Sequence, residues 1–216
     1  TSSALRDVIW NGTRFISLGN YLGQGSIIAT STDGVNWTTQ LDTLSNRTPT
    51  AKRMASIGNT VICNTTLYSS DGGLTWTQKS DTFADIIAAS STQFFKCSTN
   101  IYTSGYSTNP TSLNYQISSD NGSNWTTYTW PATVFATQST ITGNFGAVGG
   151  QIFWINNVRW CNDRWIIAGS GLVTMTTSTN STVYVVRPRL IYSTDGINWA
   201  DCLGFNYATG YNYPWE

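Results

Sequence analysis

The stretch LIYSTDGINW, from Leu190 to Trp199, decides the fold because it recurs along the chain. Related copies, STDGVNW, SSDGGLTW and SSDNGSNW, end at Trp37, Trp76 and Trp125. Two copies follow the spacing Ser-x-Asp-x-Gly-x-x-Trp, and in the other two the Gly comes directly after the Asp. Four copies of one motif in a chain of 216 residues indicate a repeat protein. We call each copy a box. The box residues are Ser31, Asp33, Gly34 and Trp37; Ser69, Asp71, Gly73 and Trp76; Ser118, Asp120, Gly122 and Trp125; and Ser193, Asp195, Gly196 and Trp199.

The repeat extends upstream of the box. WNGTRFISLG, from Trp10 to Gly19, aligns without a gap to WCNDRWIIAG, from Trp160 to Gly169. Weaker versions, SIGNTVICN and ASSTQFFKC, lie in the same relative place before the second and third boxes. Each unit therefore reads as strand, turn, strand, connection, strand, box and strand.

The residue pattern within each unit is that of short β-strands. RFISLG, TVICN, QFFKC and RWIIAG are runs of β-branched and aromatic residues bounded by Gly and Asn, and no segment has a helical apolar stripe. We predict one all-β domain over residues 1–216: a β-propeller of four four-stranded antiparallel blades with box turns. The approximate blades are 4–50, 51–84, 85–149 and 150–205, and the interval between Trp125 and Trp199 leaves room for a fifth.

The box has the chemistry of a stabilised turn. Asp and Ser side chains accept hydrogen bonds from the backbone amides of their own turn, and Gly supplies a positive φ. A buried Trp covers about 150–250 Å², so at about 25 cal/mol per Å² each box Trp contributes up to about 4–6 kcal/mol before entropy is subtracted. We expect the box residues to be structural.

In all four units these boxes resemble the Asp-box repeats, also called bacterial neuraminidase repeats. That family of β-propellers includes sialidases, sortilin-type receptors, photosynthetic assembly factors and many phage tail or virion proteins. The resemblance implies that each box lies at the periphery, between the last two strands of a blade, and is not catalytic.

The residue inventory argues against an enzyme. The chain has no His, and its only Glu is Glu216, so Ser-His-Asp and Cys-His sites and the Tyr-Glu pair of sialidases are excluded. The Phe-Arg-Ile-Pro motif of sialidases is absent. Arginines gather in the fourth unit, but Arg14 occupies the repeat position of Arg164, which favours a role on the blade surface. The Asp residues outside the boxes, such as Asp81, Asp85 and Asp163, are scattered. We predict no catalytic residues.

Metal and cofactor sites are not expected either. The box lacks the further Asp, Asn and Glu ligands of a calcium loop, and the cysteines have neither CxxC spacing nor His partners. We expect free thiols, with one pair, Cys161 and Cys202, as the first disulfide to test. The four cysteines are Cys63, Cys97, Cys161 and Cys202.

Charge and hydropathy exclude two further partners. Only 10% of the residues are charged, with 11 basic and 11 acidic side chains, so the chain lacks the basic face that nucleic acid requires. No run approaches the roughly 18 consecutive apolar residues of a membrane span, and Thr1 opens no signal-peptide pattern.

Function is expected where the units differ, because the shared positions serve folding. The third unit carries the insertion NIYTSGYSTNPTSLNY and the fourth carries LVTMTTSTNSTVYVVRP, both between the second and third strands. These segments and the tail at 206–216 are rich in Tyr, Thr and Asn, which suits contact with a sugar or a protein. The same loops could instead pack over a blade or a neighbouring subunit, and the tail could dock onto the first blade. The candidate contact residues are Tyr102, Tyr106, Tyr115, Tyr184, Tyr211, Tyr213 and Trp215.

The leading hypothesis is a non-catalytic virion-surface protein of a tail fibre, head fibre or decoration, in keeping with the style of virion Asp-box sequences. It would attach to a host surface glycan or receptor or contact other virion proteins, and it could be an oligomer. One alternative is a secreted lectin-like or receptor ectodomain, which several Asn-x-Ser/Thr sequons would suit. The other is a degenerate sialidase-like glycosidase.

Overall fold

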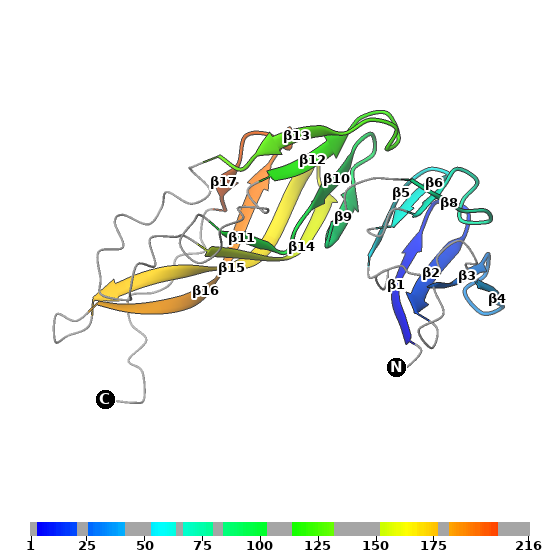
Figure 1. Ribbon diagram of the computed structural model, residues 1–216, viewed down its shortest axis with the longest axis horizontal. Helices are drawn as coiled ribbons and strands as arrows, with labels where there is room; N and C mark the ends of the chain where they lie inside the picture. Colours follow the sequence, from blue (N-terminus) through cyan, green and yellow to red (C-terminus); the bar gives the residue numbers. More distant parts are fainter. Residues whose placement is uncertain are drawn as a thin grey trace.

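The computed structural model describes residues 4–20, 26–41, 53–63, 67–79, 84–102, 114–131, 152–176 and 182–202. These residues form strands and turns, with no helix among them. Four antiparallel sheets follow one another along the chain as the four blades of a β-propeller (Figure 1). The all-β propeller predicted from the boxes is confirmed, and no fifth sheet occurs in the described ranges.

Blades 1, 2 and 3 each contain four strands in an up-and-down order. Blade 1 consists of β1 (Ala4–Trp10), β2 (Phe15–Asn20), β3 (Ser26–Ser31) and β4 (Thr38–Leu41). Blade 2 consists of β5 (Met54–Ile57), β6 (Thr60–Cys63), β7 (Leu67–Ser69) and β8 (Thr77–Gln78). Blade 3 consists of β9 (Ile86–Ala89), β10 (Phe94–Cys97), β12 (Asn114–Ser118) and β13 (Thr126–Thr129).

Blade 4 has five strands rather than four. Its own strands are β14 (Ile152–Cys161), β15 (Arg164–Thr176), β16 (Thr182–Ser193) and β17 (Ala200–Asp201). The fifth is β11 (Asn100–Tyr102), which leaves blade 3 after β10 and pairs antiparallel with β14. The start of the third unit's insertion therefore joins the neighbouring blade.

The insertion of the fourth unit continues the sheet. Residues of this insertion extend β15 and β16 into a long hairpin, in which Leu172 pairs with Val186 and Thr176 with Thr182. Figure 1 shows this hairpin reaching away from the rest of blade 4. Both insertions thus add to one five-stranded sheet.

The gapless repeat between the first and fourth units is visible in the strand register. A bulge interrupts the pairing of β1 with β2 between Leu5 and Asp7, and another interrupts β14 and β15 between Ile155 and Asn157. Trp10 pairs with Phe15 in blade 1 as Trp160 pairs with Trp165 in blade 4. The two blades share their irregularities as well as their strands.

The blades pack face to face through three apolar clusters. The first cluster joins blades 1 and 2, the second joins blades 2 and 3, and the largest joins blades 3 and 4 around Phe95 and Trp165. The first strands β1, β5, β9 and β14 contact one another in succession. Burial of apolar side chains between adjacent sheets is therefore what holds the blades together.

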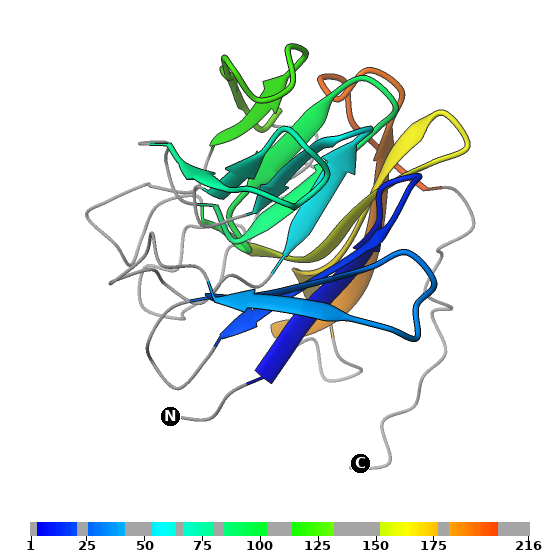
Figure 2. The ribbon, with the colours of Figure 1, turned by 90° about the vertical axis from the view of Figure 1, so that its right-hand side faces the viewer.

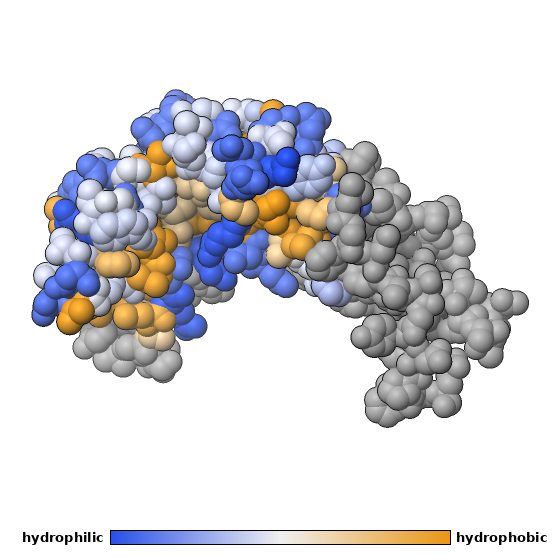
Figure 3. Space-filling view, turned by 180° about the vertical axis from the view of Figure 1, so that it is seen from behind, coloured by the Kyte–Doolittle hydropathy of each residue, from blue (hydrophilic) through white to orange (hydrophobic). Residues whose placement is uncertain are grey.

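The described blades form an arc whose ends do not meet. Blades 1 and 4 lie at opposite ends of the long axis in Figure 1, and Figure 3 shows the arch from behind. In Figure 2 blade 1 stands nearest the viewer, in front of the other blades. Among the described strands β1 and β14 are not a packed pair. Each end of the arc therefore presents one blade face that no other described blade covers.

Candidate functional site

Each box forms the turn between the last two strands of its blade. The four boxes connect β3 to β4, β7 to β8, β12 to β13 and β16 to β17. In the fourth box the Ser193 hydroxyl donates to Asp195 Oδ1 at 2.8 Å and accepts the Gly196 amide at 2.8 Å. Asp195 Oδ1 also accepts the amides of Ile197 and Asn198, both at 2.8 Å. With the Asp195 amide, which donates to the Ser193 hydroxyl at 3.3 Å, the two side chains satisfy four backbone donors of the turn, as the spacing predicted.

The other boxes repeat this arrangement with small variations. The Ser hydroxyl donates to the box Asp at 2.9 Å in the first box and 2.7 Å in the second and third. Asp33 Oδ2 accepts the Asn36 side-chain amide at 2.8 Å, and Asp120 Oδ2 accepts that of Asn124 at 2.7 Å. In the second box the Thr75 hydroxyl takes this role. Every box carboxylate is therefore committed to its own turn.

These hydrogen bonds stabilise the ionised carboxylates. For Asp120, donation from the Asn124 amide, the Asn124 side chain and the Ser118 hydroxyl lowers the pKa to about 2. For Asp71, partial burial raises the pKa, but hydrogen bonds from Thr75, Ser69 and Leu74 outweigh it and bring the pKa to about 2. The pKa values of Asp33 and Asp195 are lowered further by the same kinds of donor. A carboxyl with so low a pKa is a poor general acid near neutral pH.

The box glycines allow the turn to approach the neighbouring blade. Gly196 has a φ of 76°, and a Cβ added there would lie 2.7 Å from Ile117 Cδ1 of blade 3. A side chain at this position would therefore meet both backbone strain and a packed apolar atom.

Three box tryptophans pack onto the blade that precedes their own. The Trp199 indole of blade 4 is 5% exposed and donates to the Tyr115 hydroxyl of blade 3 at 3.3 Å. The Trp125 indole of blade 3 donates to the Tyr68 hydroxyl of blade 2 at 3.2 Å. Trp76 of blade 2 packs against the cluster that includes Ile16 of blade 1 and donates to its own turn.

The first box differs because the described blades include none before it. Trp37 is 39% exposed, and its indole donates to Gly34 O of its own turn at 3.0 Å. The expectation of a buried Trp in every box is met in full only at Trp199, since Trp76 and Trp125 are half-buried and Trp37 is exposed.

Tyr115 is a correction to the predicted contact residues. Its side chain is 1% exposed and stacks on Phe95 within the cluster between blades 3 and 4. Burial also raises the pKa of its hydroxyl, while the hydrogen bond from Trp199 opposes that shift. Tyr115 serves the contact between blades and is not accessible to a partner.

Among the remaining candidates, two are placed by their backbone. Tyr102 ends β11 and pairs with Ile152, and Tyr184 lies on β16 opposite Thr174. Both therefore belong to the five-stranded sheet of blade 4. Tyr106, Tyr211, Tyr213, Trp215 and the docking tail at 206–216 lie outside the described residues.

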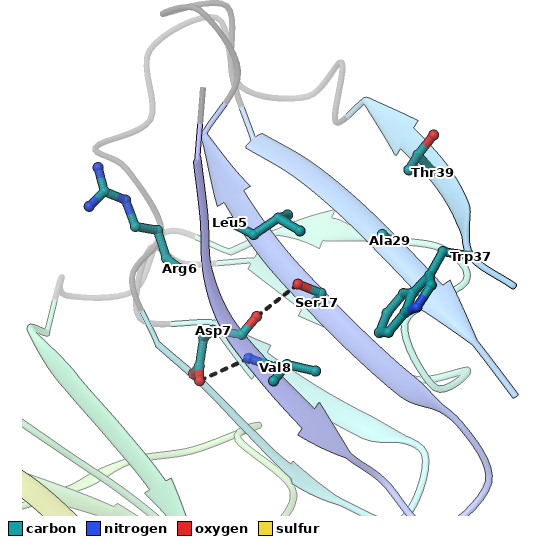
Figure 4. Close-up of a pocket in the computed structure, with 8 residues that line it drawn as sticks. All are labelled: Leu5, Arg6, Asp7, Val8, Ser17, Ala29, Trp37 and Thr39. Atoms are coloured by element: carbon teal, nitrogen blue, oxygen red, sulfur yellow. Dashed lines mark hydrogen bonds between the residues drawn. The ribbon is translucent and has the colours of Figure 1, made fainter. Parts of the chain in front are cut away.

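The sequence did not reveal an apolar face at the blade 1 end of the arc. A groove of about 580 Å³ lies there, lined by Leu5, Arg6, Asp7, Val8, Ser17, Ala29, Trp37 and Thr39 (Figure 4). The side chains of Leu5 and Val8 are 60% and 56% exposed, and Trp10 beside them is 50% exposed. Nothing in the first box signalled this face, because its residues match those of the other boxes.

The polar groups of this groove are already engaged. Asp7 accepts the amide of Val8 at 3.0 Å and, from blade 2, the amide of Met54 at 2.8 Å. The Ser17 hydroxyl donates to the Asp7 carbonyl at 3.0 Å. Figure 4 shows Arg6 and Asp7 directed away from the space between Val8 and Trp37. What remains exposed is mainly apolar.

Several of the charged residues considered for catalysis make local contacts. Arg189 forms a two-point ion pair with Asp201, at 2.8 Å and 3.1 Å, and Arg164 lies over the Tyr192 ring. Asp85 accepts the amide and hydroxyl of Thr99. Asp81 lies outside the described residues.

The described residues show the state of the cysteines and the grouping of possible metal ligands. All four cysteines are free: Cys63 and Cys97 are buried, Cys161 is exposed and Cys202 is half-buried. Within the described ranges no three His, Cys, Asp or Glu side chains are grouped so as to hold a metal ion. The same ranges contain no helix of the length and apolarity that a membrane crossing requires.

Comparison with known proteins gives no family. The chain matches no protein-family model, and no curated protein matches it.

Proposed function

We propose that this chain is a non-catalytic contact protein of a virion exterior, built on an Asp-box propeller, that attaches to another protein through the face of blade 1. The location follows from the resemblance of the four boxes to those of phage tail and virion propellers. The contact follows from the physical character of the blade 1 face.

The exposed apolar side chains of blade 1 are the observation that carries the proposal. Leu5, Val8, Trp10 and Trp37 are each between 39% and 60% exposed and share one end of the arc. Figure 3 shows apolar atoms exposed on the inner side of the arch and at this end. Apolar surface gathered in this way is typical of a protein interface.

A protein suits this face better than a sugar does. A glycan site needs several hydrogen-bonding groups placed to meet hydroxyls, but Ser17 and Asp7 already bond to each other's strand and to blade 2. A host glycan or receptor remains the alternative partner for the five-stranded sheet of blade 4, which carries Tyr102 and Tyr184.

The hydrogen bonds and lowered pKa values of the carboxylates support a non-catalytic role. Glycoside hydrolysis requires two carboxyl groups facing one bond, one with a raised pKa. The four box carboxylates have lowered pKa values, and Asp7, Asp85 and Asp201 accept hydrogen bonds from neighbouring groups.

The test combines labelling of particles with binding assays. An antibody against the chain should label intact virions of its source. The purified protein should capture a capsid or tail protein of those virions, and the exposed-face variant Val8→Glu should weaken capture at least tenfold. Val35→Glu is the matched control, because Val35 is 80% exposed on the turn of the same blade but outside the groove.

Three results would contradict the proposal. Virions that the antibody does not label would contradict the location on the virion exterior. Binding on a glycan array without any virion-protein partner would replace protein contact by glycan attachment. Hydrolysis of a sialoside, lost on changing Asp163 or Asp85, would establish an enzyme.

A further inference from the structure

The three interfaces between blades are built in one way, and this regularity defines two faces on every blade. The backward face carries the box Trp and packs onto the preceding blade. In blade 2 this face consists of Met54, Val61, Cys63, Leu67 and Trp76, which pack with Ile16, Leu18 and Ile28 of blade 1. In blade 4 it consists of Ile155, Val158, Trp165, Ile167, Ile191 and Trp199, which pack onto blade 3.

Strand register identifies the backward face of blade 1. Phe15 pairs with Ser31 as Trp165 pairs with Ser193, and Ser17 pairs with Ala29 as Ile167 pairs with Ile191. Val8, opposite Ser17, therefore corresponds to Val158, opposite Ile167. Val158 is fully buried, whereas Val8 is 56% exposed. The backward face of blade 1 thus has the interface pattern without a described blade to cover it.

The forward face of blade 4, which points away from blade 3, is the complementary exposed face. By register, Ile166 and Tyr192 of blade 4 correspond to Ile62 and Tyr68 of blade 2, since each pair faces across the second and third strands next to the box Ser. Ile62 and Tyr68 are buried under blade 3, whereas Ile166, Leu190 and Tyr192 are half-buried. No described blade follows blade 4, and none of the described blades covers its forward face.

The backward face of blade 1 and the forward face of blade 4 carry one hydrogen-bond donor and acceptor that match, Trp37 and Tyr192. Tyr68 accepts the indole N–H of Trp125 from the following blade. Tyr192 occupies the same position of blade 4, and Trp37 occupies the position of Trp125 in blade 1. Trp37 now donates to its own turn, as Trp76 does where the preceding blade offers Thr30 in place of a Tyr. A blade bearing Tyr192 would offer Trp37 the acceptor that Tyr68 offers Trp125.

We propose that the backward face of blade 1 packs onto the forward face of blade 4 in a second copy of this chain, head to tail. The two faces lie at opposite ends of the arc and are not packed on each other within one chain (Figure 1). The contact continues the blade order 1, 2, 3, 4 into the next copy, so it reuses the geometry of the three internal interfaces. Such a heterologous contact ends only when the copies close into a ring.

This contact uses the same face of blade 1 as the proposed virion partner, so a second copy and that partner should compete for it. Self-association is tested on the purified full chain alone, so its outcome is separate from that of the capture experiment. Sedimentation equilibrium of the wild-type protein should give a dimer or larger assembly. Val8→Glu should raise the dissociation constant at least tenfold, and the matched control Val35→Glu should leave it unchanged. On the opposite face, Leu190→Glu should have the same effect as Val8→Glu, and Tyr192→Phe should weaken association several-fold.

Mixing the two disrupted chains decides the polarity of the contact. A Val8→Glu chain retains an intact blade 4, and a Leu190→Glu chain retains an intact blade 1, so an equimolar mixture should associate where each alone does not. If the circular dichroism melt shows that Leu190→Glu is not folded, Arg159→Asp, at an exposed position of the same face, replaces it. A wild-type protein that is still monomeric at about 100 μM would overturn the proposal, because its dissociation constant would then lie well above that concentration. Unchanged association of Val8→Glu, or a mixture that stays monomeric, would overturn it as well.

Discussion

Removal of the indole of Trp199 should destabilise the fold far more than removal of the indole of Trp37, although both occupy the same box position. Trp199 is 5% exposed, and its ring lies 5.4 Å from Trp130 and 5.9 Å from Phe95, between centroids. Replacement of a buried Trp by Ala costs about 3–5 kcal/mol. The change also deprives the buried Tyr115 hydroxyl of the only donor that the described contacts give it.

The cost at Trp37 follows from its exposure. Trp37 is 39% exposed, so about a third less of its surface is buried than in Trp199. For a side chain of roughly 250 Å² this difference is about 80 Å², or about 2 kcal/mol at 25 cal/mol per Å². Trp37→Ala should therefore reduce the free energy of unfolding by about 2 kcal/mol less than Trp199→Ala does.

Urea unfolding followed by circular dichroism measures both losses. The experiment is run at a protein concentration at which sedimentation shows monomer, so that contact through blade 1 adds nothing to the stability of the wild type. Any partner binding by Trp199→Ala should change only in proportion to the fraction unfolded. Equal losses of stability in the two variants would refute the reasoning that the preceding blade is what makes a box Trp stabilising. Loss of binding in a fully folded Trp199→Ala protein would refute the structural role of the box.

Three further predictions concern the boxes and the thiols. The pKa values of Asp71 and Asp120 are lowered from 3.8 to about 2, so their contribution to stability should be full above about pH 4 and be lost as the pH falls towards 2. Asp120→Asn should flatten this part of a plot of the thermal midpoint against pH. An unchanged slope in this variant would contradict the prediction. Gly196→Ala should lower the free energy of unfolding by more than about 1 kcal/mol because it adds strain at positive φ and a clash with Ile117. Gly58→Ala isolates the cost of positive φ alone, since an added Cβ there meets no atom within 4 Å, and it should lose less stability. Equal melting temperatures of the two variants would count against the clash. Iodoacetamide should modify the exposed Cys161 in the native protein and spare the buried Cys63 and Cys97. Mass spectrometry of tryptic peptides measures the modification at each site. A Cys161 that iodoacetamide does not modify in the native protein would contradict its exposed position.

The recurring box made most of the fold predictable. Local chemistry is sufficient for the turn, since Ser193 and Asp195 bond only to their own segment, and four such turns place four pairs of outer strands. The gapless alignment of Trp10 with Trp160 even reproduces the bulges near Leu5 and Ile155.

Features that depend on contact between blades were not predictable from the repeat alone. β11 pairs with the neighbouring blade although its sequence belongs to the third unit, and nothing local specifies that partner. Trp37 has the same box as Trp199, and it is exposed because no described blade packs onto it. The burial of Tyr115 did have a signal, because it lies two residues before Ile117 on β12 and alternation places both side chains on one face.

A double-mutant cycle between Trp125 and Tyr68 tests most directly whether each box Trp joins its blade to the one before. Both residues are changed to Phe, singly and together, and the free energies of unfolding are compared. The hydrogen bond of 3.2 Å between indole and hydroxyl predicts a coupling of about 0.5–1.5 kcal/mol. Additive losses, with a coupling below about 0.3 kcal/mol, would contradict the account.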